Sequence, residues 1–179
     1  VTTNSKKLDE KIKKIRSLGI QKSNKKHWEY DVKYPGFNFR LNDFQCSLGI
    51  SQLNKVKRFL KYRKKIADKY NKQLKNIPDI AIPIHLKEYI SSNHLYLINL
   101  KIPNYKKKEK LIKYMLKNKI ILQYHYIPIY KFNLYRGKQH LSYNTQIYYN
   151  STISLPIYYN LSSKEQNYII NLINKFFKS

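Results

Sequence analysis

The longest run of apolar residues at helical spacing lies between residues 43 and 74. Its members are Phe44, Leu48, Val56, Phe59, Leu60, Ile66, Tyr70 and Leu74. Asn42, just before the run, is a residue type that caps helix N-termini well, and Gln45 follows at the spacing of a capping box. We therefore predict one long helix from about Asp43 to Leu74. Gly49 and Ser51 are expected to weaken or bend it.

Shorter patterns predict the rest of the fold. Ser5 and Ser162 are candidate N-caps, and Gly19 is a candidate helix end. Further helices are predicted at about residues 6–18, 106–118, 142–150 and 162–177. Short or alternating apolar runs predict extended segments at 80–84, 94–102, 120–127 and 153–155, whereas residues 20–35 look polar and irregular. The order of these elements predicts the α/β class, with helices packed on one face of a small sheet.

Composition limits the class of protein. A chain of 179 residues suits one domain, or one domain with an appendage, and it can bury a sizeable core. No run approaches the roughly 18 apolar residues of a membrane span. Cys46 is the single cysteine, which excludes an internal disulfide and fits a reducing compartment. We therefore expect a cytoplasmic protein.

The net charge of +26 raises the possibility of a nucleic-acid-binding protein. Of the 36 basic residues, however, five are arginine, the residue that recognises phosphate by geometry. The excess is lysine, which accompanies many Asn, Ile and Tyr, as in a protein from an A/T-rich genome. The lysines are also spread along the predicted helices, so we expect a solvated surface and no nucleic-acid partner.

The stretch from Pro35 to Leu53 carries the candidate chemistry. Gly36 permits a tight turn. After it, Phe37 and Phe39 alternate with Asn38 and Arg40, which predicts an extended segment with a packed aromatic face and a polar face. An amide and a guanidinium next to a helix start suit an anionic ligand. The alternative is that both side chains satisfy nearby backbone groups.

Residues 36–53 read G-F-N-F-R-L-N-D-F-Q-C-S-L-G-I-S-Q-L. This sequence resembles the signature of the DegT/StrS family of pyridoxal-phosphate-dependent sugar aminotransferases. Later segments resemble the same family, namely H-L-Y-L-I-N-L at 94–100, Y-H-Y-I-P-I-Y at 124–130 and S-L-P-I-Y-Y-N-L-S-S-K-E-Q at 154–166. The resemblance covers nearly the whole chain. It implies the C-terminal part of a fold-type-I aminotransferase, with a long helix and a small sheet covered by helices.

The resemblance also implies a division of the chain. Residues 1–34 would end the large cofactor-binding domain, 35–76 would hold the signature turn and the connecting helix, and 77–179 would form a small C-terminal α/β domain. The lysine that binds the cofactor covalently in this family would precede Val1. We therefore expect no catalytic residue within the chain, and expect it to be inactive by itself, as a C-terminal fragment.

Several site residues follow from the resemblance. Asn38 matches the family residue that donates to the cofactor phosphate of the neighbouring subunit in a homodimer, and Arg40 either adds charge there or pairs with Asp43. His125 and Tyr126 are placed near the sugar nucleotide. Tyr130, which takes the place of a second histidine in many relatives, would donate to the same substrate. No metal-ligand spacing is present, and His94 is expected to be a core histidine.

The implied reaction takes an amino group from glutamate, through pyridoxal phosphate, to a 4-keto-6-deoxy sugar nucleotide. Trp28 and Tyr30, the segment Ser51–Leu53 and residues 125–130 together most resemble the branch that uses a UDP-4-keto-6-deoxy-N-acetylhexosamine in pseudaminic acid synthesis. Two alternatives are open. The chain is an inactive fragment that acts in dimerisation, or a basic nucleic-acid-binding protein.

Overall fold

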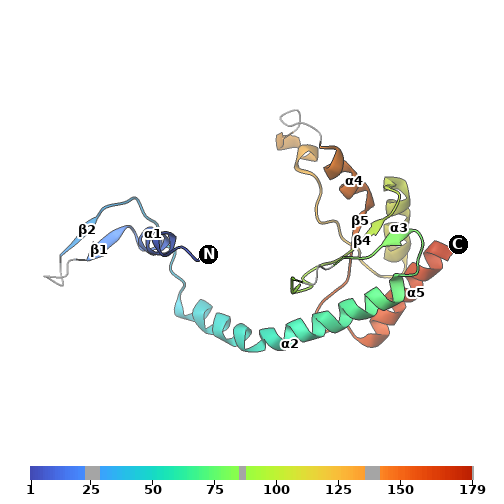
Figure 1. The fold of residues 1–179 in the computed structure, drawn as a ribbon, viewed down its shortest axis with the longest axis horizontal. Helices are drawn as coiled ribbons and strands as arrows, with labels where there is room; N and C mark the ends of the chain where they lie inside the picture. Colours follow the sequence, from blue (N-terminus) through green and yellow to red (C-terminus); the bar gives the residue numbers. More distant parts are fainter. Residues whose placement is uncertain (23–28, 85–87, 136–141, 179) are drawn as a thin grey trace. The chain divides into compact units, whose positions relative to one another are not determined.

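The computed structural model describes residues 1–22, 29–84, 88–135 and 142–178, in an α/β fold drawn in Figure 1. The chain divides into two compact units, Val1–Lys55 and Val56–Ser179. The division at residues 34 and 76 that the family resemblance implies stays a prediction, since compactness does not define a family's domain limits.

The first unit begins with α1 (Lys6–Arg16), as predicted. The Ser5 hydroxyl accepts a hydrogen bond from the Leu8 amide at 3.4 Å, and Leu18 and Gly19 then take positive φ angles. A two-stranded antiparallel sheet follows, formed by β1 (Ile20–Lys22) and β2 (Tyr30–Val32). The prediction of an irregular segment from 20 to 35 is wrong at these strands. They are short and mostly exposed, so they carry no apolar alternation that a sequence pattern would reveal.

The end of α1 is joined to the turn after Pro35 by three backbone hydrogen bonds. Phe37 N donates to Ile15 O at 2.7 Å, Leu18 N donates to Phe37 O at 3.0 Å, and Phe39 N donates to Arg16 O at 3.0 Å. These bonds require the two backbones to lie very close together, and a Cβ built at Gly36 would lie 2.2 Å from Gly19 N. Gly36 is therefore required by packing.

The long helix α2 (Asp43–Leu74) has the predicted limits and continues through Gly49. The capping box is present: Asn42 Oδ1 accepts from Gln45 N at 2.9 Å, and Gln45 Oε1 accepts from Asn42 N at 3.0 Å. Burial differs along the helix. Its second half buries Ile66, Ala67, Tyr70 and Leu74, whereas the apolar side chains of its first half are exposed, Phe44 to 90%.

The second unit is built on a three-stranded antiparallel sheet with the order β3–β4–β5. The strands are β3 (Ile80–Ala81), β4 (Tyr96–Leu100) and β5 (Thr152–Leu155), with Ile98 opposite Ile153. The predicted strand at 120–127 is wrong. This segment makes a single bridge, Gln123 to Ser154, and the chain bends two residues later at His125, so the pairing does not continue as a strand.

Helices α3 (Tyr105–Lys117), α4 (Tyr143–Ser151) and α5 (Ser163–Lys178) complete the second unit, with the short 3-10 turns η1 (Ile129–Lys131) and η2 (Asn133–Tyr135) before α4. The α5 start is a capping box, since Ser162 and Glu165 exchange hydrogen bonds of 2.8 and 3.2 Å. Hydrogen bonds from the side chain and the backbone of Ser162 lower the pKa of the Glu165 carboxyl. The core lies in this unit and unites residues of α2, α3, α5 and the sheet. Its fully buried aliphatic side chains include Leu74, Ile98, Leu111, Ile153 and Ile173.

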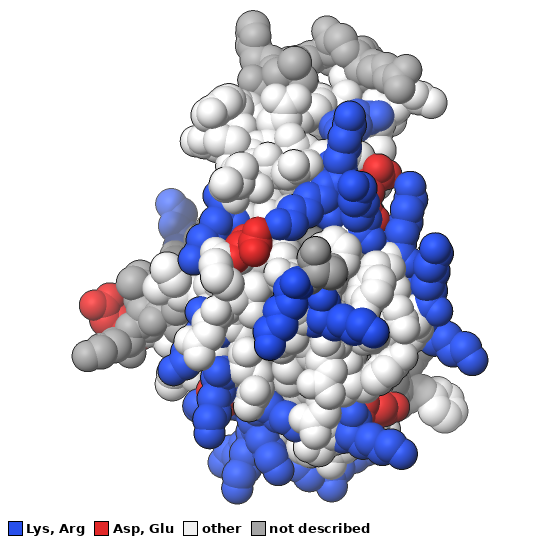
Figure 2. All heavy atoms as spheres, turned by 90° about the vertical axis from the view of Figure 1, so that its right-hand side faces the viewer, with Lys and Arg blue, Asp and Glu red and all other residues white. Residues whose placement is uncertain are grey.

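Charge is distributed widely over the surface. On the face shown in Figure 2, Lys and Arg side chains are scattered among uncharged residues and do not form one stripe. Among the described residues, no helix is both long and apolar enough to cross a membrane.

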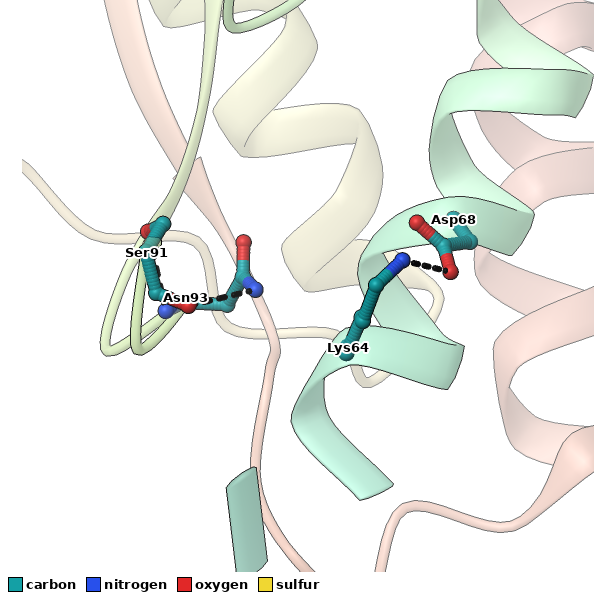
Figure 3. Close-up of polar contacts among 4 residues, drawn as sticks. All are labelled: Lys64, Asp68, Ser91 and Asn93. Atoms are coloured by element: carbon teal, nitrogen blue, oxygen red, sulfur yellow. Dashed lines mark hydrogen bonds and ion pairs between the residues drawn. The ribbon is translucent and has the colours of Figure 1, made fainter. Parts of the chain in front are cut away.

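The Arg63 side chain connects α2 with the backbone just before β4 and just after β5. Its Nη1 donates to the carbonyls of Asn93 at 3.1 Å, His94 at 2.9 Å and Ile157 at 3.3 Å. Asn93 has a φ of 48° and is nearly buried, and its amide and backbone N bond to Ser91, as Figure 3 shows. Arg63 therefore fixes the backbone at His94.

We expect Arg63→Met to lower the free energy of unfolding of the second unit by about 2–3 kcal/mol, because it removes charge-assisted bonds to half-buried carbonyls while keeping the apolar stem. Lys64→Met is the matched control. Lys64 is exposed and pairs with Asp68 one turn along α2 at 2.7 Å (Figure 3), and such a surface pair contributes about 0.5 kcal/mol or less. Thermal and urea unfolding followed by circular dichroism measures both. Equal losses in the two variants would contradict this role of Arg63.

Candidate functional site

Asn38 and Arg40 form one polar pair in the first unit. Arg40 Nε donates to Asn38 Oδ1 at 2.9 Å, and both side chains are exposed. Asn38 itself is held in an isolated antiparallel bridge with Ser17, beside the hydrogen bonds that join 37–39 to the end of α1. The α2 start follows immediately. The pair thus stands on a backbone fixed from two sides.

The hydrogen bond to Arg40 also fixes which way the Asn38 amide faces. A guanidinium has donors only, so the atom that it contacts must be the amide oxygen. Nδ2, with two N–H groups, is then turned away from Arg40, and no described residue accepts from it. Two donors on one exposed nitrogen, with a guanidinium beside them, favour a phosphate or another oxyanion. The predicted alternative pairing of Arg40 with Asp43 is not formed.

The aromatic side chains of the same segment differ from expectation. Phe37 and Phe39 stack on each other, with ring centroids 5.0 Å apart and an interplanar angle of 13°. Both are exposed and are not packed into a core. They alternate with Asn38 and Arg40 as predicted, but the predicted packing of the aromatic face is not present among the described residues.

The second unit places His125 in a surface pocket of about 310 Å³ beside the end of β5. His125 Nδ1 lies 2.6 Å from the Ser154 hydroxyl, and the Tyr148 hydroxyl of α4 donates to His125 O at 3.2 Å. Gln123 and Tyr158 also line the pocket. Burial and the nearby Glu165 raise the pKa of Tyr158, so its hydroxyl stays a donor at neutral pH.

Tyr126 and Tyr130 follow His125 but face different surroundings. The His125–Tyr126 peptide bond is cis, the two rings meet edge to face at 4.7 Å, and Tyr126 is 73% exposed. Tyr130 belongs to η1, and its hydroxyl is buried without a hydrogen-bond partner among the described residues. Neither tyrosine lines the pocket of His125. The structure therefore brings His125 and Ser154 together, with the tyrosines on the adjoining segment.

His94 is a residue that sequence reasoning misjudged. It was predicted to be a core histidine, yet it is exposed and lines the same pocket as His125. The reason is that β4 begins only at Tyr96, so His94 lies in the turn that Arg63 holds. The nearby Ser91 and Asn93 are turn-forming residues and were the available signal.

We expect Tyr130→Phe to leave the free energy of unfolding unchanged or to raise it by up to about 1 kcal/mol, because the variant removes a buried hydroxyl without a described partner. Tyr70→Phe is the contrast. The Tyr70 hydroxyl donates to Pro156 O at 2.9 Å in the core, and its loss should cost about 1 kcal/mol or more. Urea unfolding measures both. A loss of stability in Tyr130→Phe as large as that in Tyr70→Phe would show that the Tyr130 hydroxyl has a structural partner.

Other kinds of site find no support in the described part of the chain. No group of three or more His, Cys, Asp or Glu side chains there is arranged to hold a metal ion. Cys46 is exposed and unpaired at the start of α2. The chemistry of the two candidate sites is thus that of oxyanion and hydroxyl recognition by amide, guanidinium, imidazole and phenol groups.

Comparison with known proteins decides the family. Residues 1–174 match the DegT/DnrJ/EryC1/StrS aminotransferase family. The chain belongs to this family. The aminotransferases of this family depend on pyridoxal phosphate.

Two curated relatives are similar to the chain over nearly its whole length. The chain is 36% identical over 173 residues to a Campylobacter jejuni UDP-4-amino-4,6-dideoxy-N-acetyl-beta-L-altrosamine transaminase, covering 94% of this chain and 45% of that protein. It is 36% identical over 182 residues to the Helicobacter pylori protein of the same name, covering 100% of this chain and 48% of that protein. The chain therefore spans about half the length of the curated relatives that it matches.

The solved structure of Helicobacter pylori PseC, an aminotransferase involved in the biosynthesis of pseudoaminic acid, has the same fold over the matched part. It superimposes with a TM-score of 0.83 at 34% sequence identity, covering 98% of this chain and 47% of that one. The predicted α/β fold of a C-terminal aminotransferase portion is confirmed.

Proposed function

We propose that this chain is the C-terminal portion of an aminotransferase that uses pyridoxal phosphate and transfers an amino group from glutamate to a 4-keto-6-deoxy sugar nucleotide. The observation that carries the proposal is the Asn38–Arg40 pair within the family signature, since its orientation leaves two amide donors and a guanidinium for a phosphate. The Campylobacter and Helicobacter relatives support the choice of a UDP-linked sugar of the pseudaminic acid type.

In this proposal Asn38 and Arg40 hold the cofactor phosphate. Pyridoxal phosphate bound there would supply the chemistry of amino-group transfer between the donor and the keto sugar. Asn38 donates to a phosphate oxygen, and Arg40 keeps the amide oriented and adds positive charge. The turn at Gly36 and the α1 end keep both in place. The lysine that holds the cofactor covalently is not assigned to any residue of this chain.

The sugar nucleotide would lie against the second unit. His125 would donate to a diphosphate oxygen or a sugar hydroxyl, and its contact with Ser154 would set the orientation of the ring. Tyr126 and Tyr130 would add hydroxyl donors. The Tyr130 hydroxyl is buried and has no hydrogen-bond partner among the described residues, which supports this role because a buried donor needs an acceptor.

A homodimer, with the cofactor at the subunit interface, is part of the proposal. The exposed apolar residues in the first half of α2 support it, since such surfaces are usually covered in the assembled protein. We place the enzyme in the cytoplasm, where a lone exposed Cys46 would stay reduced. The division into residues 1–34, 35–76 and 77–179 belongs to the same proposal.

The test is to express this chain joined to the coding sequence that precedes it and to add pyridoxal phosphate. We expect a visible absorbance band of bound cofactor and glutamate-dependent amination of a UDP-4-keto-6-deoxy-N-acetylhexosamine. The joined protein with His125→Ala is the internal comparison, since it should keep the absorbance band and raise the KM for the sugar nucleotide. Absence of both the band and the amination in the unmodified protein would refute the proposal.

A further inference from the structure

The mechanism leaves one cluster of charged and aromatic side chains unused. It lies in the second unit, next to the segment that carries Tyr126 and Tyr130. The lysine–tyrosine cluster consists of Tyr105, Lys108, Tyr124, Lys131 and Tyr149. Its members come from α3, from the segment before His125, from η1 and from α4. Four parts of the unit therefore meet at it.

Lys108 is the buried cation of the cluster. It is 1% exposed, and its Nζ donates to the carbonyl of Tyr149. The same nitrogen lies 4.1 Å from the ring centroid of Tyr124 and 4.6 Å from that of Tyr149. A lysine is rarely buried without a carboxylate, and no described carboxylate forms an ion pair with Lys108. Its partners among the described residues are two aromatic rings and one carbonyl.

Lys131 reaches the same ring from η1. Its Nζ lies 4.1 Å from the centroid of Tyr149 and 5.7 Å from that of Tyr105, while its side chain stays exposed. Each contact has cation–π geometry. Because both lysine nitrogens approach one ring, their separation cannot exceed the sum of the two ring distances. Two like charges at that range repel each other, and they share one aromatic partner.

The surroundings of Lys108 favour its neutral form more than water does. Burial and, next, the charge of Lys131 lower its pKa to about 8. The other titratable groups around the cluster are Tyr105, Tyr124, Tyr149 and Glu109. Burial is the largest cause that raises the pKa of Tyr124 and of Tyr149, the latter to about 12, so both rings stay neutral where Lys108 titrates.

The sign of the pH effect follows from linkage. The unfolded chain holds the Lys108 proton with an ordinary lysine pKa of about 10.4, so the folded state is favoured as pH rises from about 8 toward that value. Loss of the proton removes the charge repulsion between Lys108 and Lys131. The Tyr149 ring then interacts with one cation, Lys131. Docking of η1 on the cluster should therefore strengthen as Lys108 becomes neutral.

We propose that Lys108 and Lys131 are positioning residues for η1. The protonation of buried Lys108 controls how tightly Lys131 docks η1, and with it Tyr130, onto Tyr149. Lys131 directly follows Tyr130 in η1, and Tyr124 directly precedes His125. The cluster thus holds both ends of residues 125–130, the segment that the proposed function places against the sugar nucleotide. Its consequence for substrate rests on that proposed function, whereas the docking itself does not.

Nuclear magnetic resonance of the 179-residue chain, with isotope-labelled lysine, tests the docking without any substrate. Between pH 6.5 and 9.5 we expect the ε-carbon of Lys108 to titrate with a midpoint near 8. The ε-methylene protons of Lys131 should move upfield with the same midpoint, because the ring current of Tyr149 acts more strongly as the side chain docks.

Three variants make the test specific. Lys108→Met should hold the Lys131 protons upfield at every pH and abolish the step. Lys131→Met should raise the Lys108 midpoint by about half a unit, because one like charge is gone. Lys110→Met, an exposed neighbour on α3, should change neither quantity. If Lys108→Met fails to fold, Lys131→Met still decides the matter.

The proposal is overturned if the Lys131 protons show no step in the unmodified chain. It is equally overturned if Lys131→Met leaves the Lys108 midpoint where it was, or shifts it no more than Lys110→Met does. A joined protein that fails to aminate a sugar nucleotide would refute the proposed function and leave these resonances unchanged, so the two failures are distinguishable.

Discussion

Gly36→Ala should separate the signature turn from the end of α1, whereas Gly49→Ala should not harm the fold. A Cβ at Gly36 would lie 2.2 Å from Gly19 N and 2.4 Å from Leu18 C, both backbone atoms that cannot swing aside. Relief of this overlap requires the loss of the hydrogen bonds that Phe37 and Phe39 make with α1. We expect a local destabilisation of about 3 kcal/mol or more, since each lost bond contributes about 1 kcal/mol.

Gly49 supplies the matched control for Gly36. Nothing lies within 4 Å of a Cβ at Gly49, which is exposed in the second turn of α2. Alanine there should stabilise the helix by up to about 1 kcal/mol, because glycine is a poor helix former. The two variants should therefore change stability in opposite directions, Gly36→Ala lowering it and Gly49→Ala raising it.

Amide hydrogen exchange measures both variants in the 179-residue chain. In Gly36→Ala the Leu18, Phe37 and Phe39 amides should lose roughly a hundredfold of protection, which corresponds to about 3 kcal/mol. The α2 amides should keep theirs. Protection of Leu18 and Phe37 that is unchanged in Gly36→Ala would show that the turn tolerates a side chain and would contradict the close approach.

Local signals made most of the fold predictable. The capping boxes at Asn42 and Ser162 bring donor and acceptor together within three residues, so the sequence alone determines where α2 and α5 begin. The same holds for Asn104 and Ser142, whose side chains cap α3 and α4. Such contacts do not depend on the rest of the molecule, and for that reason helix starts were predicted well.

Strands depended on distant partners and were predicted less well. Residues 120–127 are as apolar as a strand, but they make one bridge, from Gln123 to Ser154, and the chain bends at His125. Conversely, β1 and β2 pair with each other although little of either is buried. Whether an extended segment joins a sheet is decided by the neighbouring strand, which a pattern within one segment does not contain.

For the candidate site, the sequence predicts residues, which stay predictions, but it does not predict the contacts that these residues make. Asn38 and Arg40 were found because they alternate with Phe37 and Phe39, yet their mutual hydrogen bond was not foreseen and a pairing with Asp43 was left open. His125 was found from its motif, whereas its partner Ser154 lies 29 residues away in sequence. Contacts at that separation follow from the sheet register.

Asn38→Asp should abolish cofactor binding by the joined protein while leaving the turn intact. An aspartate still offers an oxygen to Arg40 Nε, so the hydrogen bond that holds the side chain is kept. The other position then presents a negative oxygen in place of two N–H donors. Toward a phosphate the variant loses a charge-assisted hydrogen bond and gains a like charge, and we expect the Kd for pyridoxal phosphate to rise by about 100-fold or more.

Asn42→Asp is the control for Asn38→Asp, because it introduces the same change of charge four residues along the chain. Aspartate caps a helix as well as asparagine does, so α2 should begin where it does now. Titration of each purified apo-protein with pyridoxal phosphate, followed by visible absorbance, measures the two affinities, and circular dichroism confirms that both variants fold. A weakening of similar size in both variants would assign the effect to net charge. Unchanged affinity in Asn38→Asp would remove Asn38 from the phosphate site, because the geometry of the Asn38–Arg40 pair leaves no other group of that residue to bind an anion.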